Sequence, residues 1–536
     1  MDSGYKRRRS RWRATKVYRL TPLSDGGFWP YLLQAFGQDK SRPSESASLF
    51  LNESSMKAII RHLSVSVLAL TAAGCATPNP TALERPGDVP VAFTAPVVKE
   101  SPIWPEAGWW ANFKAPELPA LEDTAAKENL DIAAAAAQVL QAEATDGVAF
   151  SALLPTVSGS AGDTRKATNT VIGGTTNEAN SNAFTAGVSA SYGFDLWGLS
   201  QDKLRQARES LRAARYAETA VGLTTAASIA NEYFTVLSYR ERITIARQNI
   251  DAANRILAVT QAKVTNGVSS NLDLAQQQST VAAQQARLPG LIESEREARY
   301  ALAILLGRAP EGFDVQAQNL DGIVSPNAQP GLPSEMLLRR PDVAQAEANL
   351  YAAHANVDAA RAAFFPQIGL TGSAGYASAA IDGLTNPGNF IWSIGLSMVQ
   401  SIFDGGRLKA QDDLALAQQM QLIATYRKTV FSAFSDVETS LGQASSDTDQ
   451  LVALTEEVRA SAEAFRIAEL QYREGTIDIL SLLTTQQTLF TAEDTLVQTK
   501  LARLQADVSV YRSLGGGWTQ AAADTAYQPQ LDWWPL

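Results

Sequence analysis

Cysteine and histidine are nearly absent from the chain. Its 536 residues hold one cysteine, Cys75, and two histidines, His62 and His354. A single cysteine excludes an intrachain disulfide and a cysteine-rich metal site, and two histidines leave little for a zinc centre or a catalytic triad. No convergent set of acid, base, nucleophile and metal ligand is visible, so an enzyme is the weakest functional class. We expect no metal site and no cofactor.

Long apolar runs and a positive charge balance are also lacking. No apolar run reaches the roughly 20 residues of a membrane-spanning helix. Residues 75–536 hold 33 Lys and Arg against 50 Asp and Glu, a net charge of −17. This balance argues against nucleic acid as a partner, because phosphate contacts need cationic patches.

The N-terminal residues 1–74 are predicted to be an extension followed by a signal peptide, outside the folded part of the protein. Residues 1–55 show no periodic pattern and are interpreted as an untranslated or disordered extension, a real basic extension being the alternative. Residues 56–74 have the basic start, the apolar run and the small residues of a secretory signal. The end of this signal resembles a bacterial lipobox, so Cys75 is expected to carry an N-terminal lipid anchor; an ordinary free or buried thiol is the alternative. Ala76 after the cysteine suits sorting to the outer membrane.

The remainder of the chain repeats itself after about 209 residues. Residues 154–162 correspond to 365–375, residues 194–198 to 403–406, and Gly267 to Gly475. Both halves have the same predicted order of elements: helix, strand, strand, very long helix, turn and long helix. Such self-similarity indicates a duplicated structural unit.

Four segments alternate between polar and apolar residues and are predicted to be strands: 157–161, 184–194, 368–376 and 392–398. One face is small and polar, while the apolar face ends in aromatic residues, as in transmembrane β-strands of about ten residues. A soluble two-layer sheet is the alternative. In the membrane reading four strands cannot close a barrel, and lipid tolerates no open sheet edge, so several copies must associate.

Two very long helices are predicted, because residues 196–263 and 408–473 contain no proline. Each carries apolar residues every seven positions, which predicts coiled-coil packing. These are Ile243, Ile250, Leu257 and Val264 in the first helix, and Leu451, Val458, Phe465 and Tyr472 in the second. Shorter helices over 272–306 and 479–514 follow. An ordinary antiparallel helical bundle would show the same periodicity.

Several motifs in a fixed order carry a family resemblance. They are Leu338-Arg339-Arg340-Pro341-Asp342-Val343, Phe403-Asp404-Gly405-Gly406, Tyr472-Arg473-Glu474-Gly475 and Leu514-Gly515-Gly516-Gly517-Trp518. On these residues the chain resembles outer-membrane efflux proteins of the TolC and OprM type, in the NodT-like lipoprotein branch. The resemblance covers roughly residues 75–520.

The resemblance implies a mixed α and β, mainly α, channel-tunnel in which four strands per protomer build a twelve-stranded barrel in a homotrimer. It implies a passive exit duct for drugs and other small molecules in the outer membrane, served by a periplasmic adaptor protein and an inner-membrane resistance-nodulation-division transporter. The implied division is 75–125 (N-terminal segment), 126–306 (first repeat), 307–334 (linker), 335–514 (second repeat) and 515–536 (tail). An exit duct for type I protein secretion and a coiled-coil surface lipoprotein are the alternative functions.

The resemblance also implies a gate just past the two helix turns. Asp273 aligns with an acidic position after the first turn, while the acidic slots after the second hold Ser481 and Thr484, with Asp478 nearby. Asp273 and Asp478 are also read as helix caps, Asp273 in a capping box with Ser270. Tyr472 and Arg473 are expected to tie neighbouring helices together. The turns at Gly267 and Gly475 are the expected adaptor contacts.

Overall fold

The computed structural model describes residues 93–94, 104–172, 175–326 and 333–520. The chain divides into two compact units, residues 1–84 and 85–536, and all described residues lie in the second. The predicted signal at 56–74, the extension at 1–55 and Cys75 therefore lie outside the described residues.

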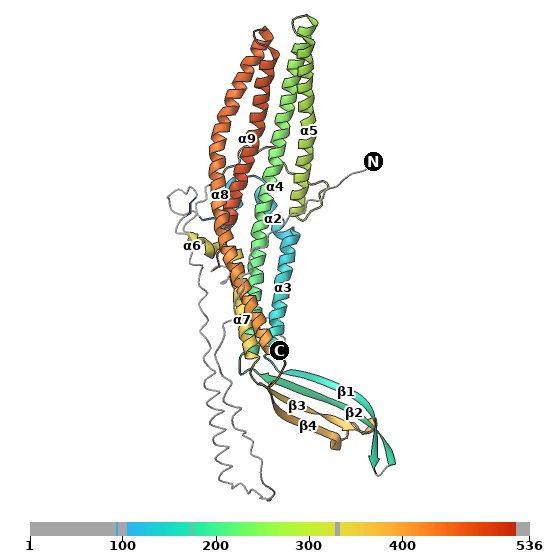
Figure 1. Ribbon diagram of the computed structural model, residues 1–536. Coiled ribbons are helices and arrows are strands. Elements are labelled where there is room, and N and C mark those ends of the chain that lie inside the picture. The colour runs from blue at the N-terminus through green and yellow to red at the C-terminus, as the bar shows by residue number, and fades with distance from the viewer. Residues whose placement is uncertain (1–92, 95–103, 173–174, 327–332, 521–536) are drawn as a thin grey trace, which may run out of the picture. The chain divides into compact units, whose positions relative to one another are not determined.

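Each repeat contributes a short helix, two strands and a hairpin of long helices (Figure 1). The first repeat comprises α3 (Leu130–Ser151), β1 (Thr156–Ile172), β2 (Thr175–Phe194), α4 (Leu199–Thr265) and α5 (Asn271–Leu305). The second comprises α7 (Pro341–Ala362), β3 (Gln367–Ser378), β4 (Phe390–Val399), α8 (Arg407–Glu474) and α9 (Ile479–Ser513). Shorter elements are η1 (Trp109–Phe113), α2 (Leu118–Glu128), α6 (Pro333–Met336), η2 (Leu337–Arg339), η3 (Ile381–Gly383) and η4 (Pro387–Asn389). The predicted order of elements within each half is confirmed.

The four predicted strands form one antiparallel sheet in the order β1-β2-β3-β4. The first two strands are longer than predicted, because β1 continues to Ile172 and β2 begins at Thr175. Beyond Gly162 the alternation disappears, since polar residues such as Asp163, Thr164 and Arg165 occupy both faces. Main-chain pairing continues there without a hydrophobic period, which is why the pattern did not reveal it.

The helices form rows in the same order as the strands. Near the sheet, α4 packs between α3 and α7, and α7 packs against α8. Towards the helix turns, α4 packs against α5 and α9, and α9 packs against α8 (Figure 1). The long helices α4 and α8 therefore belong to both rows. No helix in the described part of the chain is long and apolar enough to cross a membrane.

The largest hydrophobic cluster joins η1 and α2 to the middle of α4 and to α9. Trp109 and Phe113 are almost fully buried, and the Trp109 ring stacks on Tyr511 of α9 with a centroid distance of 5.3 Å. Phe113 contacts the ring of Phe234 on α4. These aromatic contacts bring the N-terminal segment and both repeats together at one level of the molecule.

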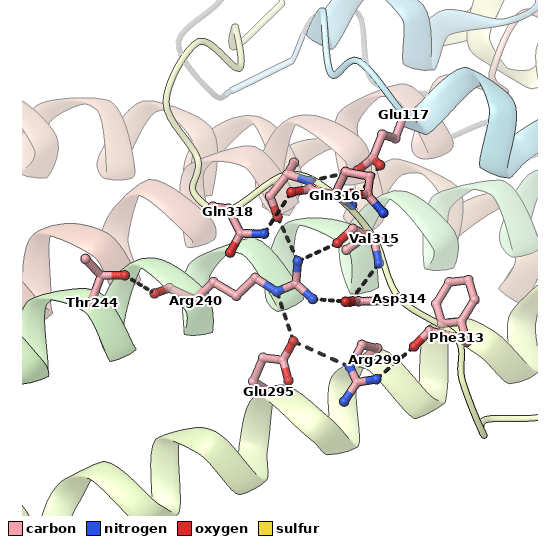
Figure 2. Close-up of polar contacts among 11 residues, drawn as sticks. Glu117, Arg240, Thr244, Glu295, Arg299, Phe313, Asp314, Val315, Gln316 and Gln318 are labelled. Atoms are coloured by element: carbon pink, nitrogen blue, oxygen red, sulfur yellow. Dashed lines mark hydrogen bonds and ion pairs between the residues drawn. The ribbon is translucent and has the colours of Figure 1, made fainter.

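Arg240 of α4 holds the linker after α5 at the same level (Figure 2). Its guanidinium donates to the carbonyls of Val315 and Ala317 at 2.6 and 2.9 Å, and to Glu295 of α5 at 2.9 Å. It also pairs with Asp314. Guanidinium donors of fixed geometry suit such multiple recognition of carbonyl and carboxylate oxygens.

The opposite side of this linker is bound by Glu117, which precedes α2. Its carboxylate accepts hydrogen bonds from the backbone amides of Gln316 and Ala317 at 2.8 and 3.1 Å. Arg299 of α5 donates to the carbonyl of Phe313 at 2.8 Å (Figure 2). Because α4, α5 and the N-cap residue of α2 all bind residues 313–317, this part of the linker is fixed against the first hairpin.

The predicted heptad seams are only partly buried. In α8, Phe465 and Tyr472 are buried, whereas Leu451 and Val458 are half-buried; in α4, Ile243 is the one buried member of the four. In α4 the most buried positions of the predicted region are Ile256 and Thr260, with Ala253, whereas Leu257 is only half-buried. The reason is that α4 packs against helices on two sides, so its buried face is wider than a single seam.

Candidate functional site

Both long hairpins turn at a glycine in the left-handed region. Gly267 follows α4 with a φ of 75°, and Gly475 is the C-cap of α8 with a φ of 81°. Glycine adopts this conformation without the steric cost that a Cβ atom brings, which makes it the usual residue after a helix end. The helix ends thus lie where the sequence predicted them, while the adaptor contact of these turns stays a prediction.

Asp273 forms the predicted capping box at the start of α5. Its carboxylate accepts hydrogen bonds from the Ser270 amide at 2.9 Å and from the Ser269 hydroxyl at 2.6 Å, and the Asp273 amide donates to Ser270 Oγ at 3.1 Å. The hydrogen bond from Ser269 is the main cause of the lowered pKa of Asp273. The side chain therefore stays ionised at the tip of the first hairpin.

Asp478 is the N-cap of α9, as predicted. It accepts a hydrogen bond from the Ser481 amide at 2.7 Å, and this contact lowers its pKa. The negative charge of Asp273 acts in the opposite direction on the same group, so the two carboxylates lie within electrostatic range of each other. Ser481 and Thr484 are exposed on the next turns of α9, where the Thr484 hydroxyl donates to the carbonyl of Leu480.

Tyr472 ties the second hairpin to the first. Its ring is almost fully buried, and its hydroxyl lies 3.0 Å from Thr260 Oγ1 on α4. Lys263, one turn further along α4, places its Nζ 4.5 Å from the centre of the Tyr472 ring and donates to the Tyr472 carbonyl. A cation over an aromatic face and at a helix C-terminus is favourable on both counts.

Arg473 makes no such connection. It is exposed and pairs with Glu469 of its own helix. Within the described protomer Tyr472 therefore joins α8 to α4, whereas Arg473 pairs within its own helix, and the role of both residues in holding neighbouring helices together stays a prediction. Sequence reasoning did not single out Lys263, although its position four residues before Gly267 places it at the helix end.

The sheet has two chemically distinct faces. On one face Trp392, Ile394, Leu396 and Met398 of β4 are 68–74% exposed. On the other, register places four serines in one row across all strands: Ser158, Ser189, Ser373 and Ser393. The hydroxyl oxygens of Ser158 and Ser189 are 2.9 Å apart, and those of Ser373 and Ser393 are also 2.9 Å apart. Among the described residues, no group of three or more His, Cys, Asp or Glu side chains could hold a metal ion.

Known proteins share the sequence features of this chain. The model of the outer membrane efflux protein family matches residues 121–308 and 332–516. The pyoverdine export outer membrane protein OpmQ of Pseudomonas aeruginosa is 40% identical over 416 residues, covering 76% of this chain and 87% of that protein. The solvent efflux pump outer membrane protein SrpC of Pseudomonas putida is 31% identical over the same shares of the two chains.

Solved structures of outer-membrane channels have a similar fold. The outer-membrane channel OprN superposes with a TM-score of 0.74 at 28% identity, covering 82% of this chain and all of that chain. The open state of the MtrE outer membrane channel of Neisseria gonorrhoeae gives a TM-score of 0.73 at 30% identity, over 81% of this chain and 96% of that chain. The chain therefore belongs to the outer membrane efflux protein family and is an outer-membrane efflux channel with the mainly helical, TolC-like fold.

Proposed function

We propose that three copies of the chain close into a ring and act as a passive exit duct for small molecules. The observation that carries this proposal is the pair of open sheet edges. In the described chain β1 pairs only with β2, and β4 pairs only with β3. Unpaired backbone groups at such an edge cost several kcal/mol each in lipid, so a membrane-embedded sheet needs a neighbouring copy at each edge.

The helices support the same closure. The order is β1-β2-β3-β4 in the sheet, α3-α4-α7-α8 beside it and α5-α4-α9-α8 towards the turns. At every level one outer element belongs to the first repeat and the other to the second. An interface between unlike edges is head-to-tail, and head-to-tail contacts form a ring when the rotation from one copy to the next closes after a whole number of copies.

The two sheet faces fit lipid and water respectively. The exposed apolar face of β4 suits the membrane, which leaves the serine row facing the lumen. The lumen-facing positions of the four-stranded section are Ser, Thr, Gly, Ala, Gln, Ile and Val, without a charged residue. Such a wall gives polar solutes hydrogen-bonding partners and raises no electrostatic barrier against either sign of charge.

The gate belongs to the opposite end of the helices. With three copies around an axis, Asp273 and Asp478 would form an acidic constriction, with Ser481 and Thr484 next to it. The turns at Gly267 and Gly475 would meet the periplasmic adaptor, which would connect the duct to a resistance-nodulation-division transporter in the inner membrane. A lipid on Cys75 would anchor each copy.

The names of the relatives indicate which substrates to test first. Two are named for pyoverdine export, others for solvent or toluene efflux, and one for cation efflux. Because the similarity to the pyoverdine exporters reaches 40% identity, we propose pyoverdine or a related solute as the first candidate substrate.

Planar lipid bilayers test the duct. The mature protein is reconstituted, single-channel current is recorded, and the mass of the assembly is measured by native mass spectrometry. Discrete current steps from a particle of three copies support the proposal. A monomeric particle, or a trimer that stays non-conducting after both helix turns are removed, would overturn it.

A further inference from the structure

A pocket of about 560 Å³ lies where the helices meet the sheet (Figure 1). The residues that line it come from the start of α4, the end of α7 and the start of α8, together with the adjoining ends of β3 and β4. The lining residues of α7 include Ala359, Ala360 and Ala363, whose side chains are too short to fill the space. The volume falls in the range of small-molecule sites, roughly 300–1,000 Å³.

Two strand residues show which face of the sheet the pocket adjoins. Gln367 of β3 and Val399 of β4 line the pocket and are register partners. Each lies six positions from a serine of the serine row, Ser373 on β3 and Ser393 on β4. Because successive side chains of a strand point to opposite faces, an even separation places all four residues on one face. In the proposed ring, the pocket therefore opens into the lumen.

The charged side chains that line the pocket are both cationic: Lys203 of α4 and Arg407 of α8. Lys203 is exposed, and its ammonium group has no ion pair or hydrogen bond with the described residues. Arg407 donates to the side chain of Gln411 at 3.2 Å, and the carboxylate of Asp404 lies 3.9 Å away. That carboxylate also accepts hydrogen bonds from two backbone amides at the start of α8.

The acidic residues on neighbouring turns are paired with other cations. Asp202 and Asp358 contact Arg205 at 2.8 and 2.6 Å, and Asp412 contacts Lys409 at 3.4 Å. None of these three carboxylates lines the pocket. The lining is therefore positively charged, in a chain whose residues 75–536 have a net charge of −17.

The other lining groups suit an organic anion. An arginine binds a carboxylate through two parallel hydrogen bonds, and a lysine adds a mobile point charge. Amide side chains can donate to a solute and accept from it, while Phe365 and Leu414 offer apolar contact. The amides of the lining are Asn356, Gln367, Gln411 and Gln418.

We propose that this pocket is a binding site inside the duct and that it takes organic anions with carboxylate groups. The inference rests on the proposed duct and names the class of solute that the duct carries. Three copies would place three such pairs of cations around the lumen, at the end of the helices opposite Asp273 and Asp478. Carboxylate-bearing solutes would then be attracted to the part of the duct that leads into the barrel.

Equilibrium dialysis of the full-length protein in detergent tests the site. The probe is trimesate, an aromatic tricarboxylate, and its neutral triamide is the matched uncharged probe. One variant combines Lys203→Gln with Arg407→Gln. The control variant combines Arg427→Gln with Lys428→Gln, which removes the same charge from exposed positions of α8 roughly 30 Å further along the helix.

Trimesate should bind the unchanged protein and the control variant equally, and should bind the pocket variant about tenfold more weakly, as loss of one charge-assisted contact implies. Lys203→Gln alone should weaken binding less, and it should leave folding intact because the ammonium group contacts no described residue. Equal binding of trimesate and the triamide, or an equal loss in the pocket and control variants, would overturn the site.

Single-channel recording tests the position of the site in the duct. Trimesate added on the side of the sheet should reduce the current through the unchanged trimer and affect the pocket variant much less. Binding without any reduction of current in a conducting trimer would overturn a site inside the duct. Dialysis does not require conduction, so the two proposals fail separately: absence of a trimer or of current refutes the duct, and charge-independent binding refutes the pocket.

Discussion

Substitution of Tyr472 by phenylalanine should make the channel open more readily. Thr260 donates its own hydroxyl proton to the carbonyl of Ile256 at 3.0 Å, so the Tyr472 hydroxyl donates to Thr260 Oγ1. This hydrogen bond joins α8 to α4 close to the turns and resists separation of the two hairpins. Phenylalanine keeps the ring and its packing against Lys263 and removes only the bond between hairpins.

The size of the effect follows from the contact. A neutral buried hydrogen bond contributes about 1 kcal/mol, and Thr260 keeps a partner after the change, so no unsatisfied group adds to the cost. If three copies move together, the closed state loses about 3 kcal/mol, which is on the order of a 100-fold shift towards the open state.

Open probability in planar bilayers measures this shift. Arg473→Gln serves as the control, because Arg473 pairs only with Glu469 of its own helix in the described chain. We expect a large rise for Tyr472→Phe and little change for the control. Equal open probabilities for both variants and the unmodified channel would refute the view that Tyr472 holds the hairpins together.

Three further changes have defined outcomes. Asp273→Ala removes the capping box and a charge at the tip, so cation selectivity should fall and the start of α5 should lose about 1 kcal/mol; unchanged selectivity and conductance would remove Asp273 from the pore lining. Burial raises the pKa of Glu122 to about 9, so the folded state holds this proton more tightly than the unfolded chain and stability falls as pH rises from 4.5 towards 9. Glu122→Gln should therefore raise the thermal midpoint at pH 8 and change it little near pH 4; equal gains at both values would contradict this reasoning. Cys75→Ser should abolish the lipid, which mass spectrometry of the purified protein would detect as a loss of the acyl mass.

Much of the fold could be predicted because its signals are local. The strands around Val188 and Ile394 could be predicted from the alternation of polar and apolar residues. The ends of the long helices could be predicted from Gly267 and Gly475, because the backbone after each helix is left-handed there. The caps at Asp273 and Asp478 depend on residues only three positions away, so they too could be read along the chain. The extension of β1 past Gly162 gave no such signal, because a strand exposed on both faces has no hydrophobic period.

The connections between distant segments could not be predicted in this way. Lys263 reaches a carbonyl 209 positions later in the chain, and Arg240 selects carbonyls of the linker that are 75 and 77 positions away. No short pattern encodes these pairings, since they depend on which helix faces which after folding. For the same reason, the structure buries Ile256 of α4 more deeply than Leu257, the residue that the heptad pattern predicted.

The sequence alone determined the duplicated order of helices and strands, the chemical difference between the sheet faces and the family resemblance. These follow from periodicity, composition and short motifs, which act over a few neighbouring residues. Only the tertiary structure decided that Tyr472 and Lys263, rather than Arg473, join the hairpins, and that α3 and α8 lie at the two ends of the helix row beside the sheet. Such contacts depend on the relative placement of helices, which arises when the whole chain packs.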